Sequence, residues 1–238
     1  MNAFSHGPLG PDAMDLSAAA HAVARRVRGG ATLWCAAPGF PELAEEMAKV
    51  LGRTRTPDNR PLSAVVVEGG HLLDSLRAQV SAGDVLVVYA RSDDPAVTGL
   101  RQRSAAWGLL TVWVAPGDRP AAGAADYILC LEEKMGSSYE SSLAALSQAL
   151  GLGLVEHLEH PELLEIEKAE CNEEVCITCS DEGRLGEVVA LYEDGQVQIR
   201  TPAGLETVDT SLIDDARPGD LVLVHAGAVL SRVDEESP

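Results

Sequence analysis

Aromatic residues are scarce in this chain of 238 residues: Phe, Trp and Tyr make up 4% of the sequence, within an apolar fraction of 46%. Any core must therefore consist mostly of Ala, Val and Leu. Long apolar runs are lacking as well, because none approaches the roughly 18 residues that a membrane-spanning helix requires. The first residues also lack the charged and apolar segments of a secretory signal. We therefore expect a cytoplasmic protein of one or two domains without a membrane partner.

Basic residues are few: 18 Lys and Arg stand against 37 Asp and Glu, which gives a formal net charge of −19. Residues 161–238 hold 19 acidic and 5 basic residues, whereas residues 1–160 hold 18 and 13. Such a surface repels phosphates, so the charge argues against a nucleic-acid partner. An acidic surface keeps a protein soluble or docks a basic partner, and we favour the first interpretation.

Cysteine is rare too, yet three of the five cysteines lie within nine positions, at Cys171, Cys176 and Cys179. This C-x4-C-x2-C spacing suits a metal site, because a C-x2-C pair on a turn directs two sulfurs at one ion. In the cytoplasm, clustered cysteines more often bind metal or do redox work than form disulfides. The fourth ligand of a tetrahedral site would be His225, Asp181, a side chain of a partner or an open position.

Strands and helices alternate up to about residue 160. Short apolar runs predict five strands, at residues 31–37, 63–69, 85–90, 109–116 and 126–133. Helical spacing or helix-start signals predict five helices, at residues 15–28, 41–52, 71–80, 92–108 and 139–157. This alternation predicts an α/β domain with a five-stranded parallel sheet in flavodoxin-like order, flanked by helices. Ligands bind such sheets beyond the carboxyl ends of the strands, here at residues 36–39 and 90–95.

The pattern changes after residue 160. Residues 160–170 are acidic and form a linker or a short helix, and four or five short strands follow, separated by Gly-containing turns. Strands of this length and number predict a small OB-like β-barrel. We therefore expect a loose leader (1–11), an α/β domain (12–159), the linker (160–170) and the barrel (171–236). Cys35 and Cys130 lie within apolar strands and are expected to be inert core thiols.

Three stretches of the barrel region carry a family pattern: CITCSDEG, GEVV and the late run PGDLVLVHAGAVLSRVDEE. The late run is similar to the pattern G-D/Q-x-V-L-V-H-x-G of the HypC/HybG/HupF family of hydrogenase-maturation chaperones. The resemblance covers about residues 171–236. It implies a barrel that works with a HypD-type scaffold protein. Together they build the iron centre, with its cyanide and carbon monoxide ligands, and deliver it to the large subunit of a nickel–iron hydrogenase.

The resemblance carries the family's functional histidine onto His225. The family's functional cysteine directly follows the initiator Met, whereas the barrel here begins deep inside the chain. Cys176, which precedes an Ile as in the family, is the preferred match, and Cys179 is the rival. One thiolate and one imidazole with open positions suit a carrier that must release its iron. The alternative is a closed structural zinc site made by Cys171, Cys176, Cys179 and His225.

Residues 12–158 resemble a sugar isomerase (SIS) domain of the phosphoheptose isomerase type, through stretches such as VRGGATLWCAAPG, AGDVLVVYARSDDPAV and GLLTVWVAP. In that family two loops, roughly G-N-G-G-S-A and S-T-S-G-N-S, cradle a sugar phosphate. The first loop here is CAAPGF, in which Pro38 removes an amide donor, and the second is YARSDDP, in which Ser92 alone keeps a hydroxyl. The crevice candidates are therefore Gly39, Ser92 and Ser138.

The charges of the second loop oppose a phosphate. Asp93 and Asp94 would each disfavour a dianion by roughly 1–4 kcal/mol, and Arg91 offsets part of this. The acid–base pair of Glu and His that such isomerases use is not evident, since the last helix has no His before His157. We expect a SIS-like domain without isomerase activity, which forms a homo-oligomer or binds another ligand.

The leading hypothesis is thus an accessory chaperone of hydrogenase maturation, carrying iron at the barrel, with a SIS-like domain for dimerisation or docking. The alternative is a SIS protein that binds a sugar phosphate or nucleotide, as isomerase or sensor, with a zinc-stapled barrel. A third hypothesis is an interaction protein whose barrel zinc serves structure alone, in which case a chelator unfolds the barrel.

Overall fold

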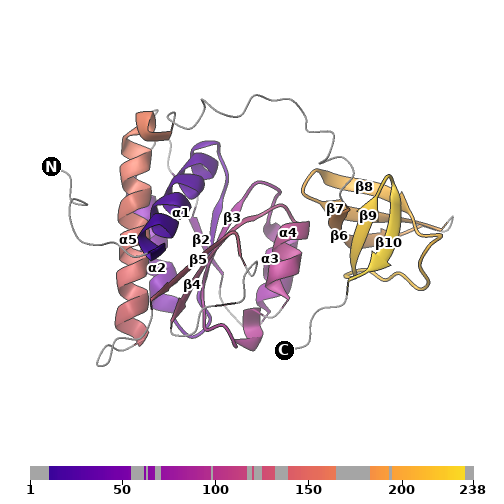
Figure 1. Ribbon diagram of the computed structural model, residues 1–238, viewed down its shortest axis with the longest axis horizontal. Coiled ribbons are helices and arrows are strands. Elements are labelled where there is room, and N and C mark those ends of the chain that lie inside the picture. Colours follow the sequence, from indigo (N-terminus) through magenta and orange to yellow (C-terminus); the bar gives the residue numbers. More distant parts are fainter. Residues whose placement is uncertain are drawn as a thin grey trace. The chain divides into compact units, whose positions relative to one another are not determined.

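The computed structural model describes residues 11–54, 62, 64–67, 71–97, 99–116, 120, 125–131, 139–164, 183–192 and 195–233. The chain forms two compact units whose segments alternate along the sequence. Figure 1 labels the helices and strands of both units. The first unit comprises residues 1–69, 85–94 and 111–166, and the second comprises residues 70–84, 95–110 and 167–238. The first unit therefore holds the sheet, and the second holds the barrel together with two helices.

The first unit is built on a five-stranded parallel sheet flanked by helices. Its elements are α1 (Pro11–Arg28), β1 (Leu33–Ala36), α2 (Pro41–Arg53), β2 (Ala64–Val67), β3 (Val85–Tyr89), β4 (Leu110–Pro116), β5 (Tyr127–Leu131), α5 (Tyr139–Glu159) and the 3-10 helix η2 (Pro161–Leu164). The strand order β2-β1-β3-β4-β5 confirms the flavodoxin-like sheet that the sequence predicted. Strand β1 pairs in parallel with β2 on one side and β3 on the other, so that Leu33 lies opposite both Ala64 and Val85.

Burial explains why the strands are almost continuously apolar. All four residues of β1 and all five of β3 are buried, as expected for strands covered on both faces. Five leucines of α5, spaced three or four residues apart, are buried at positions 143, 146, 150, 154 and 158. The buried hydroxyl groups of Tyr89 and Ser147 lie 3.0 Å apart, which links β3 to α5 by a hydrogen bond. Among the described residues, no helix has the length and apolarity of a membrane span.

The second unit contains the closed β-barrel. Its elements are α3 (Leu72–Gln79), the 3-10 helix η1 (Pro95–Val97), α4 (Leu100–Ala106), β6 (Arg184–Leu191), β7 (Gln196–Thr201), β8 (Gly204–Asp209), β9 (Leu221–His225) and β10 (Ala228–Arg232). The order β10-β8-β7-β6-β9 closes on itself, with β10 and β8 parallel and the other neighbouring strands antiparallel. This confirms the OB-like barrel. Its core consists of Val and Ile side chains at positions 188, 197, 199, 208, 222, 224 and 229, in keeping with the scarcity of aromatics.

The fourth helix begins later than the sequence predicted. We expected it to start at Ser92, but α4 begins at Leu100, after the short η1. Gly99, which directly precedes α4, has a φ of +80°, a left-handed conformation that interrupts a right-handed helix. The residues from Ser92 to Asp94 consequently form a loop, which leaves them at the carboxyl end of β3.

Candidate functional site

His225 is the last residue of β9, at one end of the barrel. Strand alternation places Val222 and Val224 in the core, where both are fully buried, and Leu223 and His225 on the outer face, where both are half-buried. The imidazole therefore lies at the surface of a rigid strand. Such a side chain is held in place and remains open to a ligand.

A strained two-residue turn fixes His225. Ala226 and Gly227 have φ values of +49° and +81°, as a type I′ hairpin turn requires at both central positions. His225 pairs with Ala228 across this turn. The turn is also tied to β8, because the backbone N–H of Asp209 donates a hydrogen bond of 3.0 Å to the carbonyl of Gly227. We call His225, Ala226 and Gly227 the His225 rim.

The first described residue after the three clustered cysteines, Gly183, lies close to the face of the barrel that carries His225. Cys171, Cys176 and Cys179 lie outside the described residues, but Gly183, just before β6, is described. A Cβ built on Gly183 would lie 2.8 Å from a methyl carbon of Leu223, which shares its face with His225. Four residues span at most about 14 Å and seven about 25 Å, so Cys179 and Cys176 both lie within chain reach of the His225 rim.

The described residues alone do not assemble a metal site. Among them, no group of three or more His, Cys, Asp and Glu side chains is placed to hold an ion. A metal at the His225 rim would therefore need ligands from beyond the described residues, such as Cys171, Cys176 or Cys179, or from a partner or a cargo fragment. The thiol of Cys35 is a poor candidate, because complete burial raises its pKa to about 12 and keeps it protonated.

A second candidate site lies in the first unit, at the point where the strand order reverses. Residues that follow β1 and β3 meet at the same edge, because these strands are parallel neighbours. Gly39, with a φ of +79°, lies in the first loop and Ser92 in the second, and both are exposed. Ser138 lies outside the described residues. The structure thus brings two of the three crevice residues to one edge of the sheet.

The charges of this crevice are partly paired with one another. Arg91 Nε donates a hydrogen bond of 3.0 Å to Asp93, and this bond and the positive charge lower the pKa of Asp93. Asp93 is therefore ionised at neutral pH, and Arg91 is engaged by it. The indole N–H of Trp113 donates to the carbonyl of Ala90 over 2.9 Å, which anchors the beginning of the loop. This pairing reduces the positive charge available for a phosphate.

Comparison with known families separates the two parts of the chain. Residues 186–237 match the HupF/HypC family. This match includes the whole His225 rim and all of β7 to β10, and it confirms the resemblance seen in the sequence. A comparison with curated proteins found no match to the chain.

The sheet region has structural neighbours of another kind. A phosphoheptose isomerase from Francisella tularensis superposes with a TM-score of 0.52 at 14% identity, covering 63% of this chain and 88% of the isomerase. A phosphoheptose isomerase from Neisseria gonorrhoeae gives a TM-score of 0.49 at 14% identity, covering 60% and 86%. At such low identity the first likeness shows a shared fold and no shared activity.

Sequence reasoning missed the turn that holds His225 and a buried charge in the barrel. The Ala-Gly pair after LVLVH was a readable signal for a hairpin, although Ala rarely adopts a positive φ. The buried charge is Glu187, which is 0% exposed and is bonded to residues 80 or more positions away. A local sequence pattern cannot predict hydrogen-bond partners of Glu187 that lie so far away in the chain.

Proposed function

We propose that this chain is an accessory protein of nickel–iron hydrogenase maturation that acts in the cytoplasm. Its barrel presents or carries iron, as a cyanide- and carbonyl-bearing fragment, through a cysteine of residues 171–179 and His225. The observation that carries the proposal is the family match of residues 186–237, which includes His225. Iron is the cargo in this proposal, because it is bound, held and passed on.

The ligand chemistry supports a carrier. A cysteine releases its proton to bind iron, and a neutral imidazole supplies a second, weaker ligand. Two protein ligands leave coordination positions for the cyanide and carbonyl groups and for an accepting protein. The turn at Ala226 holds His225 in place, and Cys179 and Cys176 are near enough to Gly183 in the sequence for either thiol to reach the histidine. Cys176 is the preferred thiolate and Cys179 the rival.

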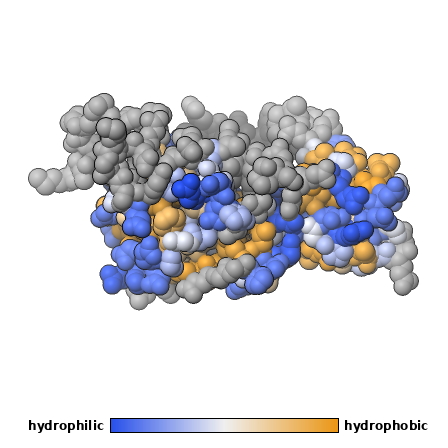
Figure 2. Space-filling model, turned by 90° about the horizontal axis from the view of Figure 1, so that it is seen from below, coloured by the Kyte–Doolittle hydropathy of each residue, from blue (hydrophilic) through white to orange (hydrophobic). Residues whose placement is uncertain are grey.

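The surface of the barrel supports a protein partner. The described residues include six large hydrophobic side chains that are strongly exposed, and five of them belong to the barrel: Leu191, Tyr192, Leu205, Leu212 and Leu230. Figure 2 shows hydrophobic side chains exposed among hydrophilic ones on this part of the surface. Aliphatic and aromatic side chains within a polar surface are typical of docking sites. The partners we propose are a HypD-type scaffold protein and the hydrogenase large subunit.

The first unit would serve for dimerisation or docking. The alternative function is binding of a sugar phosphate or nucleotide at Gly39, Ser92 and Ser138, with a zinc-stapled barrel. The position of Gly39 and Ser92 at the strand-order reversal favours it. The two functions differ in their sensitive residues: Ser92→Ala would impair the alternative and spare the carrier, whereas His225→Ala would do the reverse.

The test is metal analysis and infrared spectroscopy of the full chain purified without oxygen. We expect sub-stoichiometric iron with bands in the cyanide and carbonyl stretching regions. His225→Ala should remove the bands and lower iron content by about tenfold or more, as loss of a ligand does. Cys176→Ser and Cys179→Ser identify the leading thiolate. His160→Ala is the matched control, because this exposed histidine lies outside the barrel.

Stoichiometric zinc that survives dialysis, without those bands, would contradict the carrier function. It would indicate a closed structural site of three thiolates and His225. Unchanged iron and unchanged bands in His225→Ala would likewise exclude the proposed role of the histidine.

A further inference from the structure

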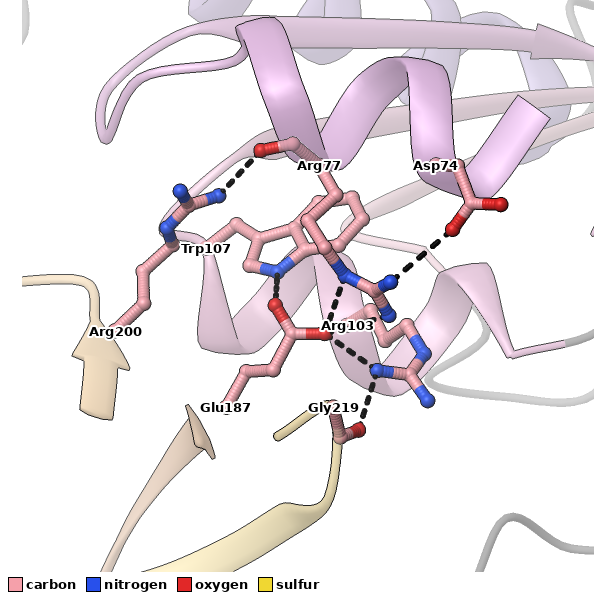
Figure 3. A network of polar contacts seen from close by, with 7 residues as sticks. All are labelled: Asp74, Arg77, Arg103, Trp107, Glu187, Arg200 and Gly219. Atoms are coloured by element: carbon pink, nitrogen blue, oxygen red, sulfur yellow. Dashed lines mark hydrogen bonds and ion pairs between the residues drawn. The ribbon is translucent and has the colours of Figure 1, made fainter. Parts of the chain in front are cut away.

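A carboxylate of the barrel is completely buried against α3 and α4. Glu187 of β6 is 0% exposed, and Arg77, Arg103 and Trp107 all direct donors at it (Figure 3). Arg77 Nε donates to Oε1 over 2.9 Å, Arg103 Nη1 donates to the same oxygen, and the Trp107 indole N–H donates to Oε2 over 2.7 Å. Both oxygens of the buried carboxylate are therefore satisfied by charged or polar donors.

The contact is reciprocal. Arg200 of β7 donates a hydrogen bond of 2.8 Å to the carbonyl of Arg77, in the last turn of α3, where backbone carbonyls lack partners within the helix. Arg103 also donates to the carbonyl of Gly219 over 2.9 Å. Each side thus satisfies polar groups of the other, which is the mark of a matched interface.

Charge and shape are both complementary at this contact. Arg77 and Arg103 face the carboxylate of Glu187, and Arg77 also pairs with Asp74 of its own helix at 3.1 Å, so these four side chains together carry no net formal charge. The chain after α4 approaches the barrel closely: a Cβ on Gly108, whose φ is +72°, would lie 2.9 Å from the Cα of Pro202. Glycine therefore permits the approach both through its conformation and through its lack of a side chain.

The buried contact lies at one end of the barrel and His225 at the other. In the antiparallel ladder of β6 and β9, Glu187 lies opposite Leu221, and Arg184 lies opposite Val224. His225 is four residues beyond Leu221, which corresponds to about 13 Å along the strand. A surface that binds the Glu187 end consequently leaves the His225 rim uncovered.

We propose that α3 and α4 form a docking surface for the barrel of the same chain, recognised through Glu187, which holds the barrel by one end and keeps the His225 rim open. Glu187 is a positioning residue in this arrangement. Burial removes the Glu187 carboxylate from water, and the positive charges of Arg77 and Arg103 compensate for the lost hydration. Without the arginines the buried carboxylate would be an unpaired charge, which is costly. The proposal stands independently of the cargo that His225 handles.

The test uses the full chain and the indole N–H of Trp107, identified by its loss from the NMR spectrum of Trp107→Phe. The wild-type indole proton should exchange slowly with solvent. Glu187→Gln should accelerate this exchange by about tenfold or more, because a charge-assisted acceptor is lost. The indole signals of Trp34 and Trp113 and the methyl signals of Val224 and Val229 should stay in place, which separates undocking from unfolding.

Glu206→Gln is the matched control. Glu206 is also a barrel carboxylate in an ion pair, with Arg184 at 2.9 Å, and it accepts a hydrogen bond from the hydroxyl of Thr201, so the partners described for it belong to the barrel. This variant should leave the Trp107 exchange rate unchanged. If Glu187→Gln fails to fold, Arg200→Gln, which removes the bond to the Arg77 carbonyl, should still give a smaller acceleration.

Three outcomes would overturn the proposal. The first is rapid exchange of the Trp107 indole proton in the wild type, and the second is an equal effect of Glu187→Gln and Glu206→Gln. The third is protection that disappears on dilution as a dimer dissociates, which would place the barrel on a second copy. A separate experiment tests whether the docked barrel leaves the His225 rim open. Diethyl pyrocarbonate should modify His225 at the same rate in the wild type and in Glu187→Gln. A slower rate in the wild type would show that docking covers the rim and would refute this part of the proposal.

Discussion

Near the candidate site, Ala226 has a backbone conformation that is unfavourable for a residue with a side chain. Its φ of +49° lies in the left-handed region, which costs a residue with a Cβ roughly 1–2 kcal/mol. The hairpin after His225 requires this conformation, because its two-residue loop needs positive φ at both positions. Strain of this kind is typical of functional sites, where the required geometry outweighs local stability, and it lies here beside a candidate ligand.

We predict that Ala226→Asn stabilises the chain. Asn tolerates the left-handed conformation, and Asn-Gly is the preferred pair for this turn, so the free energy of unfolding should rise by roughly 0.5–1 kcal/mol. Ala226→Val should lower it by roughly 1 kcal/mol or more, because a β-branched side chain suits this region least. Urea unfolding followed by circular dichroism measures both. Equal stability of the two variants would contradict the assignment of the turn.

At the scale of elements, α1 and α5 meet through a pair of histidines. The rings of His21 and His157 are 5.3 Å apart between centroids and nearly perpendicular. Burial lowers the pKa of His157, His21 lowers it further, and Glu156 opposes the shift. The folded protein therefore binds a proton at His157 less readily than the unfolded chain does. Packing of α1 against α5 therefore favours the neutral form of His157.

We predict that acid weakens this helix pair. Below the ordinary histidine pKa of about 6.5, the unfolded chain takes up a proton that folded His157 does not, so the free energy of unfolding falls as pH drops. Above that pH the group is neutral in both states and contributes no slope. His157→Gln should reduce the difference in urea midpoint between about pH 7.5 and about pH 5.5. His160→Gln, in an exposed histidine, should retain it, and identical slopes in all three proteins would refute the prediction.

At the scale of the whole molecule, charge and an exposed leucine bear on self-association. The chain carries a formal charge of −19, so copies repel each other at low salt, and salt near 0.15 M screens this repulsion beyond about 8 Å. Leu152 of α5 is 60% exposed, whereas the leucines on either side of it at 150 and 154 are buried. We propose that this outer face of α5 contributes to a homodimer.

Sedimentation velocity at physiological salt tests the proposed dimer. The wild type should sediment as a dimer, and Leu152→Glu should shift it to monomer, because the contact would then bury an unpaired charge. Leu212→Glu is the control, since Leu212 is 64% exposed on the barrel and lies far from α5 in the sequence. A monomeric wild type, or a Leu152→Glu variant that is still dimeric, would contradict the proposed role of α5 in a homodimer.

Periodicity and local turn chemistry made most of the fold predictable. The runs at β1, β3 and β4 are apolar because their strands are buried, and Pro41 begins α2 because its ring suits the first helical turn. The helix expected from Ser92 was misplaced, since the left-handed conformation of Gly99 depends on its surroundings. His225 was identifiable because its family pattern is contiguous. The roles of Cys171, Cys176 and Cys179 and of Ser138 stay predictions.

The sequence by itself determined the two architectures, the valine-rich barrel core and the candidate histidine, because each depends on residues close together in the chain. The tertiary structure alone decided the burial of Glu187 and its partners Arg77, Arg103 and Trp107. Contacts across 80 to 110 positions leave no periodic trace in a sequence. It also decided the grouping of α3 and α4 with the barrel, because a compact unit is defined by which surfaces bury one another.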